Sequence, residues 1–242
     1  MAHRGASAEA PENTLAAIER AWDYGVDGVE VDIHLSADGE CVVIHDPTTA
    51  RTTNANRRVS ECTAEELRRL DAGSWKGAEF AGQRIPLIEE VLERIPPGKF
   101  QCIELKDGEG LEEALHERLV ALGREDSVCV LAFDPERIER FKKRLPEVPA
   151  FLLLAPEVDL TAGTIRPFSE KVIEWVKACG ADAPACFEGA VTKAFVEQVH
   201  AAGMPLLVWV VDEPARAREL AAWGVDALAT NDPAKLLPAL ET

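Results

Sequence analysis

Two short segments carry charged residues at alternating positions, and both lie in apolar, β-branched surroundings. In the segment EVD, Glu30 and Asp32 are two residues apart, and in the segment ELK, Glu104 and Lys106 have the same spacing. Because alternate residues of a strand face the same side of a sheet, each pair shares one face. Burying carboxylates costs several kcal/mol unless a cation compensates them, and hard divalent ions take oxygen ligands. The pattern predicts a cation bound by Glu30, Asp32 and Glu104, with Lys106 beside it as a positive group for phosphate.

Two histidines accompany these segments. His3 precedes Arg4 close to the start of the sequence, and His45 follows the apolar run VVI and precedes Asp46. If both runs are strands, each imidazole lies at a carboxyl-terminal strand end, where β/α-barrel enzymes place their active sites. Imidazole is the side chain best suited to exchange protons near neutral pH. Asp46 either holds the tautomer of the His45 ring or only begins the turn before Pro47.

Each of these residues also has a plainer interpretation. A single histidine such as His3 is usually a surface residue. The carboxylates could form a salt-bridge network with Arg4 and Lys106 and hold no metal. Trp209 lies in a strand-like run of Leu and Val, so it could simply pack in the core. The coincidence of so many reactive groups at predicted strand ends favours a catalytic site.

An alternation of short β-branched runs with helical segments would position these residues. We count eight such units with no Ser- or Pro-rich linker, which predicts parallel strands joined by helices and closed into one α/β domain, a (β/α)8 barrel. Asp134-Pro135 and Glu213-Pro214 are typical helix starts, and glycines such as Gly123 stand where helices should end. The expected strands span about residues 2–4, 28–34, 101–106, 128–133, 150–154, 181–187, 205–211 and 226–230.

The alternation is interrupted between His34 and about Ile85. The segment SADG at 36–39 predicts a turn, after which the run at 41–45 is either a hairpin partner of strand two or a separate short strand. The segment TAEE at 63–66 has the spacing of a capping box and predicts a short helix. We expect residues 47–83 to form a rim insertion after strand two, within a single catalytic barrel domain over residues 1–242.

Composition restricts the class of protein. The 242 residues suit one β/α barrel, and 26 basic against 43 acidic residues give a formal net charge of −17. Such a charge argues against partners such as nucleic acid or anionic membranes. No apolar run is long enough to span a bilayer, no export signal precedes HRG, and the six cysteines are dispersed. We therefore expect a cytoplasmic protein with reduced cysteines, a small-molecule substrate and no stable membrane association.

Six short motifs, in their order along the chain, resemble those of the glycerophosphodiester phosphodiesterase family: HRG, PENT, VEVD, VVIHD, RTTN and IELK. The later segments DAGSW, RIPLIEEVL, LLVWVVD and GVDALATNDP are also similar to that family, so the resemblance runs nearly end to end. It implies a TIM (β/α)8 barrel with a small insertion after strand two. It also implies hydrolysis of a glycerophosphodiester to glycerol 3-phosphate and an alcohol, within lipid and glycerol metabolism.

The resemblance further implies roles for individual residues. His3 and His45 would be the catalytic acid and base. Arg4 and Lys106 would bind the phosphate, and Trp209 would form a wall for the glycerol group. Three carboxylates would bind a divalent cation, Mg²⁺ or Ca²⁺, with Mn²⁺ as an alternative: Glu30, Asp32 and Glu104.

Two departures from the family pattern concern the shape of the pocket. Val210 follows Trp209 where many members have threonine, and alanine precedes Phe133 where serine is common. These differences leave the substrate preference open. A lysophospholipid is one alternative, which would give lysophospholipase D activity, and the segment from Trp75 to Phe80 could offer its tail an apolar surface.

The PENT segment has two possible roles, and the fold itself has two possible functions. The segment could be only a helix start, or Glu12 or Asn13 could orient Arg4 from behind.

A barrel fold does not guarantee activity, so a non-catalytic protein that binds phosphate esters is a second class of function. The presence of both histidines and all three carboxylates favours an enzyme.

Overall fold

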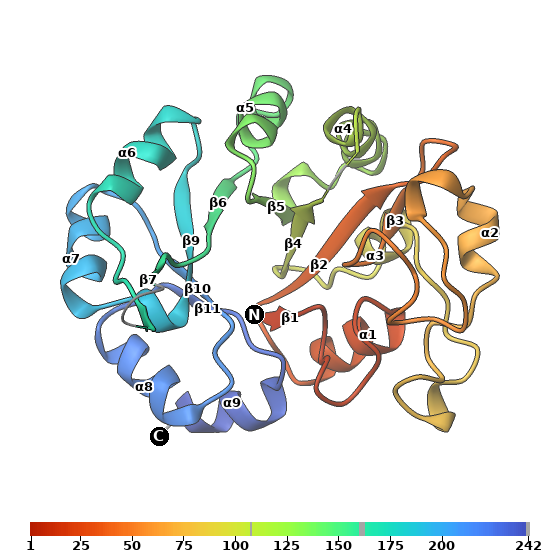
Figure 1. Ribbon diagram of the computed structural model, residues 1–242, viewed down its shortest axis with the longest axis horizontal. Coiled ribbons are helices and arrows are strands. Elements are labelled where there is room, and N and C mark those ends of the chain that lie inside the picture. The colour runs from red at the N-terminus through yellow and green to blue at the C-terminus, as the bar shows by residue number, and fades with distance from the viewer. Residues whose placement is uncertain (107, 160–162, 241–242) are drawn as a thin grey trace.

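The computed structural model describes residues 1–106, 108–159 and 163–240, and eight parallel strands in these ranges form a closed barrel (Figure 1). Around the barrel the strands are β1 (Ala2–His3), β2 (Gly28–Leu35), β4 (Phe100–Leu105), β5 (Val128–Ala132), β6 (Ala150–Leu154), β9 (Ala183–Phe187), β10 (Leu207–Trp209) and β11 (Ala227–Leu228). A parallel bridge between Ala2 and Thr230 closes the circle, with His3 N donating to Thr230 O over 2.8 Å. The predicted TIM barrel is confirmed.

Helices surround the strands on the outside (Figure 1). They are α1 (Leu15–Asp23), α3 (Ile88–Leu92), α4 (Leu111–Leu122), α5 (Pro135–Arg144), α6 (Lys171–Ala178), α7 (Lys193–Ala201), α8 (Pro214–Ala222) and α9 (Pro233–Leu240). Asp134 caps α5 by accepting from Glu136 N, and Gly123 ends α4 with a φ of 60°, as expected from the sequence. Across the described ranges, no helix combines the length and apolar character needed to cross a membrane.

Alternate strand residues divide between two apolar regions. Val29, Val31 and Ile33 face outward and pack with the helices, whereas a smaller cluster that includes Cys102, Leu131 and Leu153 fills the inside of the barrel. The residues between Val29 and Ile33 on β2 therefore point inward, which is where Glu30 and Asp32 lie.

The predicted strands are all present, but several are shorter than expected. The predicted strand at 205–211 is reduced to Leu207–Trp209, and the one at 226–230 to Ala227–Leu228. Side-chain contacts accompany backbone hydrogen bonds such as Val211 N to Ala229 O at these ends: the carboxylate of Asp226 accepts from Leu206 N over 2.8 Å, and Thr230 Oγ1 donates to Asp212 over 2.9 Å. Sequence alone does not distinguish a strand residue from one held in place by a side chain.

The run at 41–45 is a hairpin partner of strand two. Strand β3 (Cys41–Val43) pairs antiparallel with β2, with Ile33 opposite Val43. The chain then forms the short helices η1 (Val59–Glu61), α2 (Ala64–Arg68) and η2 (Ala78–Phe80), and Thr63 and Glu66 make the predicted capping box. A separate small apolar cluster forms beneath them: Val42, Ile44, Val59, Ala64, Leu67, Ala72 and Ile85. That 47–83 is a rim insertion within one domain stays a prediction.

The loop that follows β1 has an unusual backbone. Arg4 has a φ of 56° and Gly5 a φ of 79°, both in the left-handed region. A Cβ on Gly5 would lie 2.5 Å from the carbonyl carbon of Ala17, because the loop packs directly on α1. Ala6 N also donates to Ala17 O over 2.9 Å. The missing side chain of Gly5 therefore allows the approach that places Arg4 at the barrel mouth.

Gly5→Ala should destabilise the protein more than Gly25→Ala. Both glycines have a positive φ, 79° and 78°, but a Cβ on Gly25 would meet no atom within 4 Å. We expect Gly25→Ala to cost about 1 kcal/mol from backbone strain alone, and Gly5→Ala to cost at least about 2 kcal/mol more because of the overlap with α1. Urea unfolding of the two variants measures the difference, and equal losses would contradict the role of the close approach to α1.

Candidate active site

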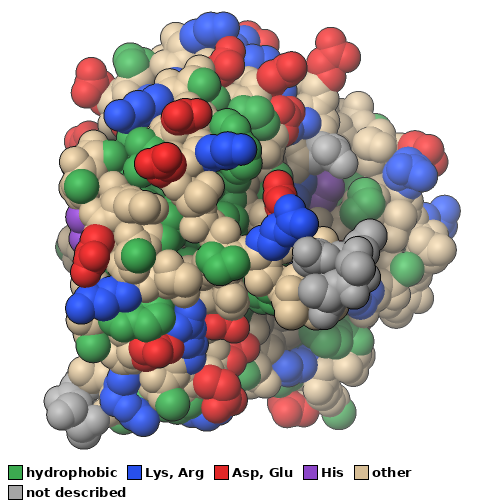
Figure 2. Space-filling model, turned by 60° about the vertical axis from the view of Figure 1, so that its left-hand side comes forward, with side chains coloured by type: hydrophobic (Ala, Val, Ile, Leu, Met, Phe, Trp, Pro, Cys, Tyr) green, Lys and Arg blue, Asp and Glu red, His purple; other side chains and the backbone are tan. Residues whose placement is uncertain are grey.

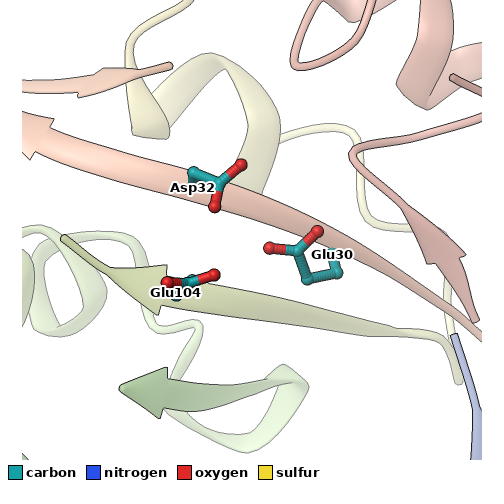
Figure 3. Close-up of side chains that lie close together, drawn as sticks. All are labelled: Glu30, Asp32 and Glu104. Carbon is teal, nitrogen blue, oxygen red and sulfur yellow. The ribbon is translucent and has the colours of Figure 1, made fainter. Parts of the chain in front are cut away.

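The three predicted carboxylates lie together at the carboxyl end of the strands. Figure 3 shows Glu30 and Asp32 on β2 and Glu104 on β4, with their carboxylates turned toward one another. Asp32 and Glu104 are direct partners across the two strands. One oxygen from each of the three side chains lies within 4.8 Å of the others, and all three side chains are buried. The grouping expected from the spacing is therefore present.

Two basic residues face this cluster. Arg4 Nε lies 3.2 Å from Asp32 Oδ2, and its backbone N–H donates to Glu30 Oε2 over 2.9 Å. Lys106 Nζ lies 3.0 Å from Asp32 Oδ1 and also pairs with Glu104. The two residues predicted to bind phosphate thus lie at the site, where they offset part of the carboxylate charge.

The two basic side chains do not balance the charge of three ionised carboxylates. Burial and the nearby Asp32 raise the pKa of Glu30 well above its usual value, and the same causes raise the pKa of Glu104 to about 7. Burial opposes ionisation of Asp32 too, but Lys106 and Arg4 hold its pKa well below its usual range. Within the described residues, Glu30 Oε1 is buried with no hydrogen bond. A divalent cation fits this set of oxygen donors, because it would supply the missing positive charge.

His3 and His45 each have one ring nitrogen held by a polar partner. His3 Nδ1 lies 2.8 Å from Asn231 Oδ1, and His45 Nδ1 lies 2.6 Å from Asp46 Oδ1. The amide of Asn231 is oriented by Asp212, which accepts from its Nδ2 over 2.7 Å, so its oxygen faces the ring. Both rings therefore carry a proton on Nδ1 and leave Nε2 available, and His3 Nε2 lies 3.9 Å from Glu30 Oε2.

The two imidazoles differ in their electrostatic surroundings. Burial and the positive charge of Arg4 lower the pKa of His3 to about 4. Burial also lowers the pKa of His45, but the carboxylates of Asp32 and Asp46 oppose that shift. His3 has a neutral amide as its partner, whereas His45 has a carboxylate. The carboxylate beside His45 therefore stabilises its protonated form, and the amide beside His3 adds no such charge.

The PENT segment does more than start a helix. Glu12 accepts from Arg4 NH1 over 2.9 Å. Asn13 donates to Asp32 Oδ2 over 2.8 Å and accepts from Asp32 N over 3.2 Å, with a φ of 59°. Thr14 is the N-cap of α1. The segment therefore starts the helix and places Glu12 against Arg4, as the sequence allowed, whereas the side chain of Asn13 holds Asp32, which was not expected.

Sequence reasoning missed several residues around the site. Asn231 and Asp212 orient His3 from β/α loops at the other end of the sequence. Arg51 contacts Glu12 and Asp46. His34 Nε2 lies 3.0 Å from the carbonyl oxygen of His45. Arg51 lies in the motif RTTN and Asn231 in the motif ATNDP. Their membership in these motifs could have pointed to them, whereas their spacing from the other site residues could not.

These groups line a pocket of about 180 Å³ whose opposite wall is apolar. Trp209 stands in this wall, packed edge-on against Phe133 and Phe187 with ring centroids 5.7 and 5.8 Å apart. Its Nε1 donates to Ala185 O over 2.9 Å, which fixes the indole. Trp209 therefore lines the pocket while it packs with its neighbours.

Trp75 and Phe80 do not line this pocket within the described part of the chain. Trp75 Nε1 donates to Ala72 O within residues 47–83. The apolar side of the pocket comes instead from residues at strand ends, among them Leu131 and Leu153. Trp75 is 40% exposed, so an apolar surface for a lipid tail between Trp75 and Phe80 stays a prediction, outside the described pocket.

The charged pocket is small beside another cavity and is set into a surface of mixed charge. A cavity of about 520 Å³ lies at the amino end of the strands, with a mainly apolar lining that includes Phe100, Val128 and Leu237. It contains none of the predicted catalytic residues. On the face drawn in Figure 2, acidic and basic side chains are interspersed, and a histidine lies recessed in a hollow. The reactive groups, and not the cavity volume, identify the site.

Comparisons with known proteins agree with this geometry. The model of the glycerophosphoryl diester phosphodiesterase family matches residues 3–235. A protein of Caldanaerobacter subterraneus subsp. tengcongensis named glycerophosphodiester phosphodiesterase is 36% identical over 244 residues, which cover 98% of this chain and 95% of that protein. A protein of the same name from Bacillus altitudinis is 32% identical, over 96% of this chain and 94% of that protein.

Solved structures show the same similarity. The phosphodiesterase of Oleispira antarctica in complex with the product sn-glycerol-3-phosphate has a TM-score of 0.87 and 29% identity, covering 100% of this chain and 96% of that one. The glycerophosphodiester phosphodiesterase of Agrobacterium tumefaciens has a TM-score of 0.82 and 28% identity, covering 98% and 97%. With its barrel, its pocket of paired histidines and carboxylates and these relatives, the chain belongs to the glycerophosphoryl diester phosphodiesterase family.

Proposed function

We propose that this protein hydrolyses glycerophosphodiesters to glycerol 3-phosphate and an alcohol, using His3 and His45 as base and acid beside a divalent cation. The observation that carries the proposal is the arrangement of the two imidazoles. Each ring is held at Nδ1, by Asn231 or by Asp46, and both rings line the same pocket as the carboxylate cluster. The product bound to the relative from Oleispira antarctica supports the choice of substrate.

Glu30, Asp32 and Glu104 would hold the cation, which is Mg²⁺ or Ca²⁺, or Mn²⁺. Three carboxylates with no thiolate or imidazole among them suit hard ions of this kind. When bound, the cation would neutralise the cluster and polarise a phosphoryl oxygen. Arg4 and Lys106 would then have their charges available for the other phosphate oxygens, each worth about 3 kcal/mol to the transition state when well placed.

The reaction proceeds in two steps within the substrate's own geometry. His3 Nε2 takes the proton of the glycerol hydroxyl next to the phosphorylated carbon, and that oxygen attacks phosphorus. The bond from phosphorus to the alcohol breaks, and His45 Nε2 gives its proton to the departing oxygen. A five-membered cyclic phosphate results. Water then opens the ring while the histidines exchange roles, His45 as base and His3 as acid.

A lysophospholipase D activity is the second candidate, and one observation favours it. Phe133 lines the apolar wall of the pocket and is 46% exposed, so an apolar group could extend past it toward the surface. Rates on glycerophosphocholine and on lysophosphatidylcholine separate the two candidates. We expect glycerophosphocholine to be the better substrate, since the described pocket holds only about 180 Å³.

Metal removal should abolish activity, and the stabilisation by Mg²⁺ should grow with pH. The cation binds ionised carboxylates, and the pKa of Glu104 is raised to about 7 by burial and by Asp32. Its proton must leave on binding, so below that pKa the affinity should fall about tenfold per pH unit for each proton released. The rise in Tm on adding Mg²⁺ should therefore be larger at pH 8 than at pH 6.

In the metal-free protein, the contribution of Glu104 to folding stability should fall as the pH rises. A carboxyl whose pKa is raised in the folded state contributes stability below its unfolded value of 4.5, and that contribution is lost as the pH rises to about 7. Glu104→Gln removes this titration, so it should fold, respond weakly to Mg²⁺ and lose most activity. Full turnover by protein confirmed to be metal-free would contradict the role of the cation.

Replacement of either histidine should reduce kcat strongly. We expect His3→Ala and His45→Ala each to lower kcat at least about 100-fold, and wild-type kcat/KM to be bell-shaped in pH, because one ring must be neutral and the other protonated. His200→Ala is the matched control, since His200 is 37% exposed and pairs with Asp226 on the outside of the barrel. A loss below about tenfold at either site would show that another group transfers the proton.

A substrate without the neighbouring hydroxyl tests the cyclic intermediate. A glycerophosphodiester analogue with that hydroxyl replaced by hydrogen should bind with similar affinity and not turn over, because no internal nucleophile remains. Calorimetry measures its binding, and release of the alcohol measures turnover. Ready hydrolysis of the analogue would show direct attack by water and would leave the roles of the two histidines standing without the cyclic phosphate.

A further inference from the structure

One arginine outside the pocket contacts the partners of two site residues. Arg51 follows β3 in the segment 47–83, and its guanidinium uses two edges. NH1 and NH2 donate to the carboxylate of Glu12 over 2.7 and 2.9 Å. Nε and NH2 donate to the carboxylate of Asp46 over 2.7 and 3.1 Å. A planar guanidinium suits this double bidentate contact, which lysine could not make.

Each of these carboxylates holds one residue of the proposed catalytic machinery. Glu12 Oε1 also accepts from Arg4 NH1 over 2.9 Å. Asp46 Oδ1 also lies 2.6 Å from His45 Nδ1. The loop after β1 and the loop after β3 thus meet at Arg51, although Glu12 and Asp46 come from different β/α units. The contacts run in one line from Arg4 through Glu12, Arg51 and Asp46 to His45.

The burial of the contacts separates this network from an ordinary surface ion pair. Arg51 is 45% exposed, but the side chains of Glu12 and Asp46 are only 13% and 27% exposed. An isolated exposed pair contributes little to stability, whereas a bidentate network holds its members in one geometry. The hydrogen bond from Arg51 also lowers the pKa of Asp46 to about 2, so Asp46 stays ionised beside His45.

We propose that Arg51 is a positioning residue that holds Arg4 and His45 in one geometry through Glu12 and Asp46. The proposal rests on the function proposed above, in which Arg4 binds phosphate and His45 transfers a proton. It gives the segment 47–83 a part in catalysis, because that segment supplies the group that ties the two loops together. Arg51 itself touches neither substrate nor cation.

The two sides of the network should have separable effects. Glu12→Gln weakens the support of Arg4, so it should raise KM for glycerophosphocholine about tenfold and change kcat little. Asp46→Asn removes the charge beside His45, so it should lower kcat about tenfold and change KM little. Arg51→Ala should raise KM and lower kcat, since it releases both carboxylates. A change confined to thermal stability would mean that Arg51 is only structural.

A double-variant comparison tests whether Arg51 is the link. Residues that act through one partner are not additive, so Glu12→Gln and Asp46→Asn should each have much smaller effects when added to Arg51→Ala than when made alone. Effects that simply multiply would overturn the proposal. Arg51→Lys keeps the charge but can reach only one carboxylate, so it should restore either KM or kcat and not both. Full recovery by lysine would show that charge alone matters, which would also overturn it.

A control and a measurement without turnover complete the design. Arg58→Ala, also between β3 and α2, removes an exposed arginine that pairs only weakly with Glu61 at 3.4 Å, and should leave both constants unchanged. Calorimetry with glycerol 3-phosphate, with Mg²⁺ present, should show weaker binding by Arg51→Ala and Glu12→Gln but not by Asp46→Asn. The wild type could bind glycerol 3-phosphate, with weaker binding by Arg51→Ala and Glu12→Gln only, and still hydrolyse no glycerophosphodiester. The proposed function would then fail, while the positioning of Arg4 by Arg51 would stand. Equal binding by all four proteins would overturn the positioning of Arg4.

Discussion

The site is organised by the burial of three carboxylates against two basic side chains at one end of the barrel. Glu30, Asp32 and Glu104 share a space in which Arg4 and Lys106 offset only part of their charge. In a buried site, an unbalanced charge must be neutralised by a proton or a cation. The raised pKa values of Glu30 and Glu104 mean that protons can neutralise these two carboxylates, and a bound divalent cation would neutralise them instead. The same ion pairs hold Arg4 and Lys106 at the barrel mouth, so in the proposed function metal binding and substrate binding would depend on one balance of charge.

The features with a strict structural period could be predicted from the sequence. Alternation placed Glu30 and Asp32 on one face of β2, and the repeated strand and helix pattern gave the barrel, now confirmed. What the sequence did not contain was the register between strands. That Asp32 stands opposite Glu104 depends on which residues pair across β2 and β4, and neighbouring strands can slide without any change in local pattern. The strand ends were misjudged for a related reason, because a backbone amide at a strand end can donate to a side chain. The amide of Leu206 donates to the carboxylate of Asp226 in this way.

Residues that support the site were harder to foresee because they act across large separations in the chain. Asn231 reaches His3 over 228 positions, and Arg51 reaches Glu12 over 39. Neither type of residue signals chemistry by itself, since an asparagine or an arginine in a loop is usually solvated. The aromatic residues show that residue type alone does not give the place of a side chain. Trp75 drew attention by its type but lies outside the pocket, whereas Phe133 joins Trp209 in the wall because β5 and β10 end at the same rim.

The two histidines have different supports, and this difference bears on the direction of proton transfer in the proposed mechanism. Asn231 fixes the His3 ring without adding charge, and burial together with the positive charge of Arg4 lowers the pKa of His3, so this ring is kept neutral. Burial lowers the pKa of His45 as well, but Asp46 fixes this ring and opposes that shift. If both partners were carboxylates, both rings would tend to hold protons, and neither would take one from a hydroxyl. In the proposed mechanism, an amide behind one ring and a carboxylate behind the other would let a base and an acid coexist in one pocket, and Arg51 binds the same Asp46 carboxylate that contacts His45.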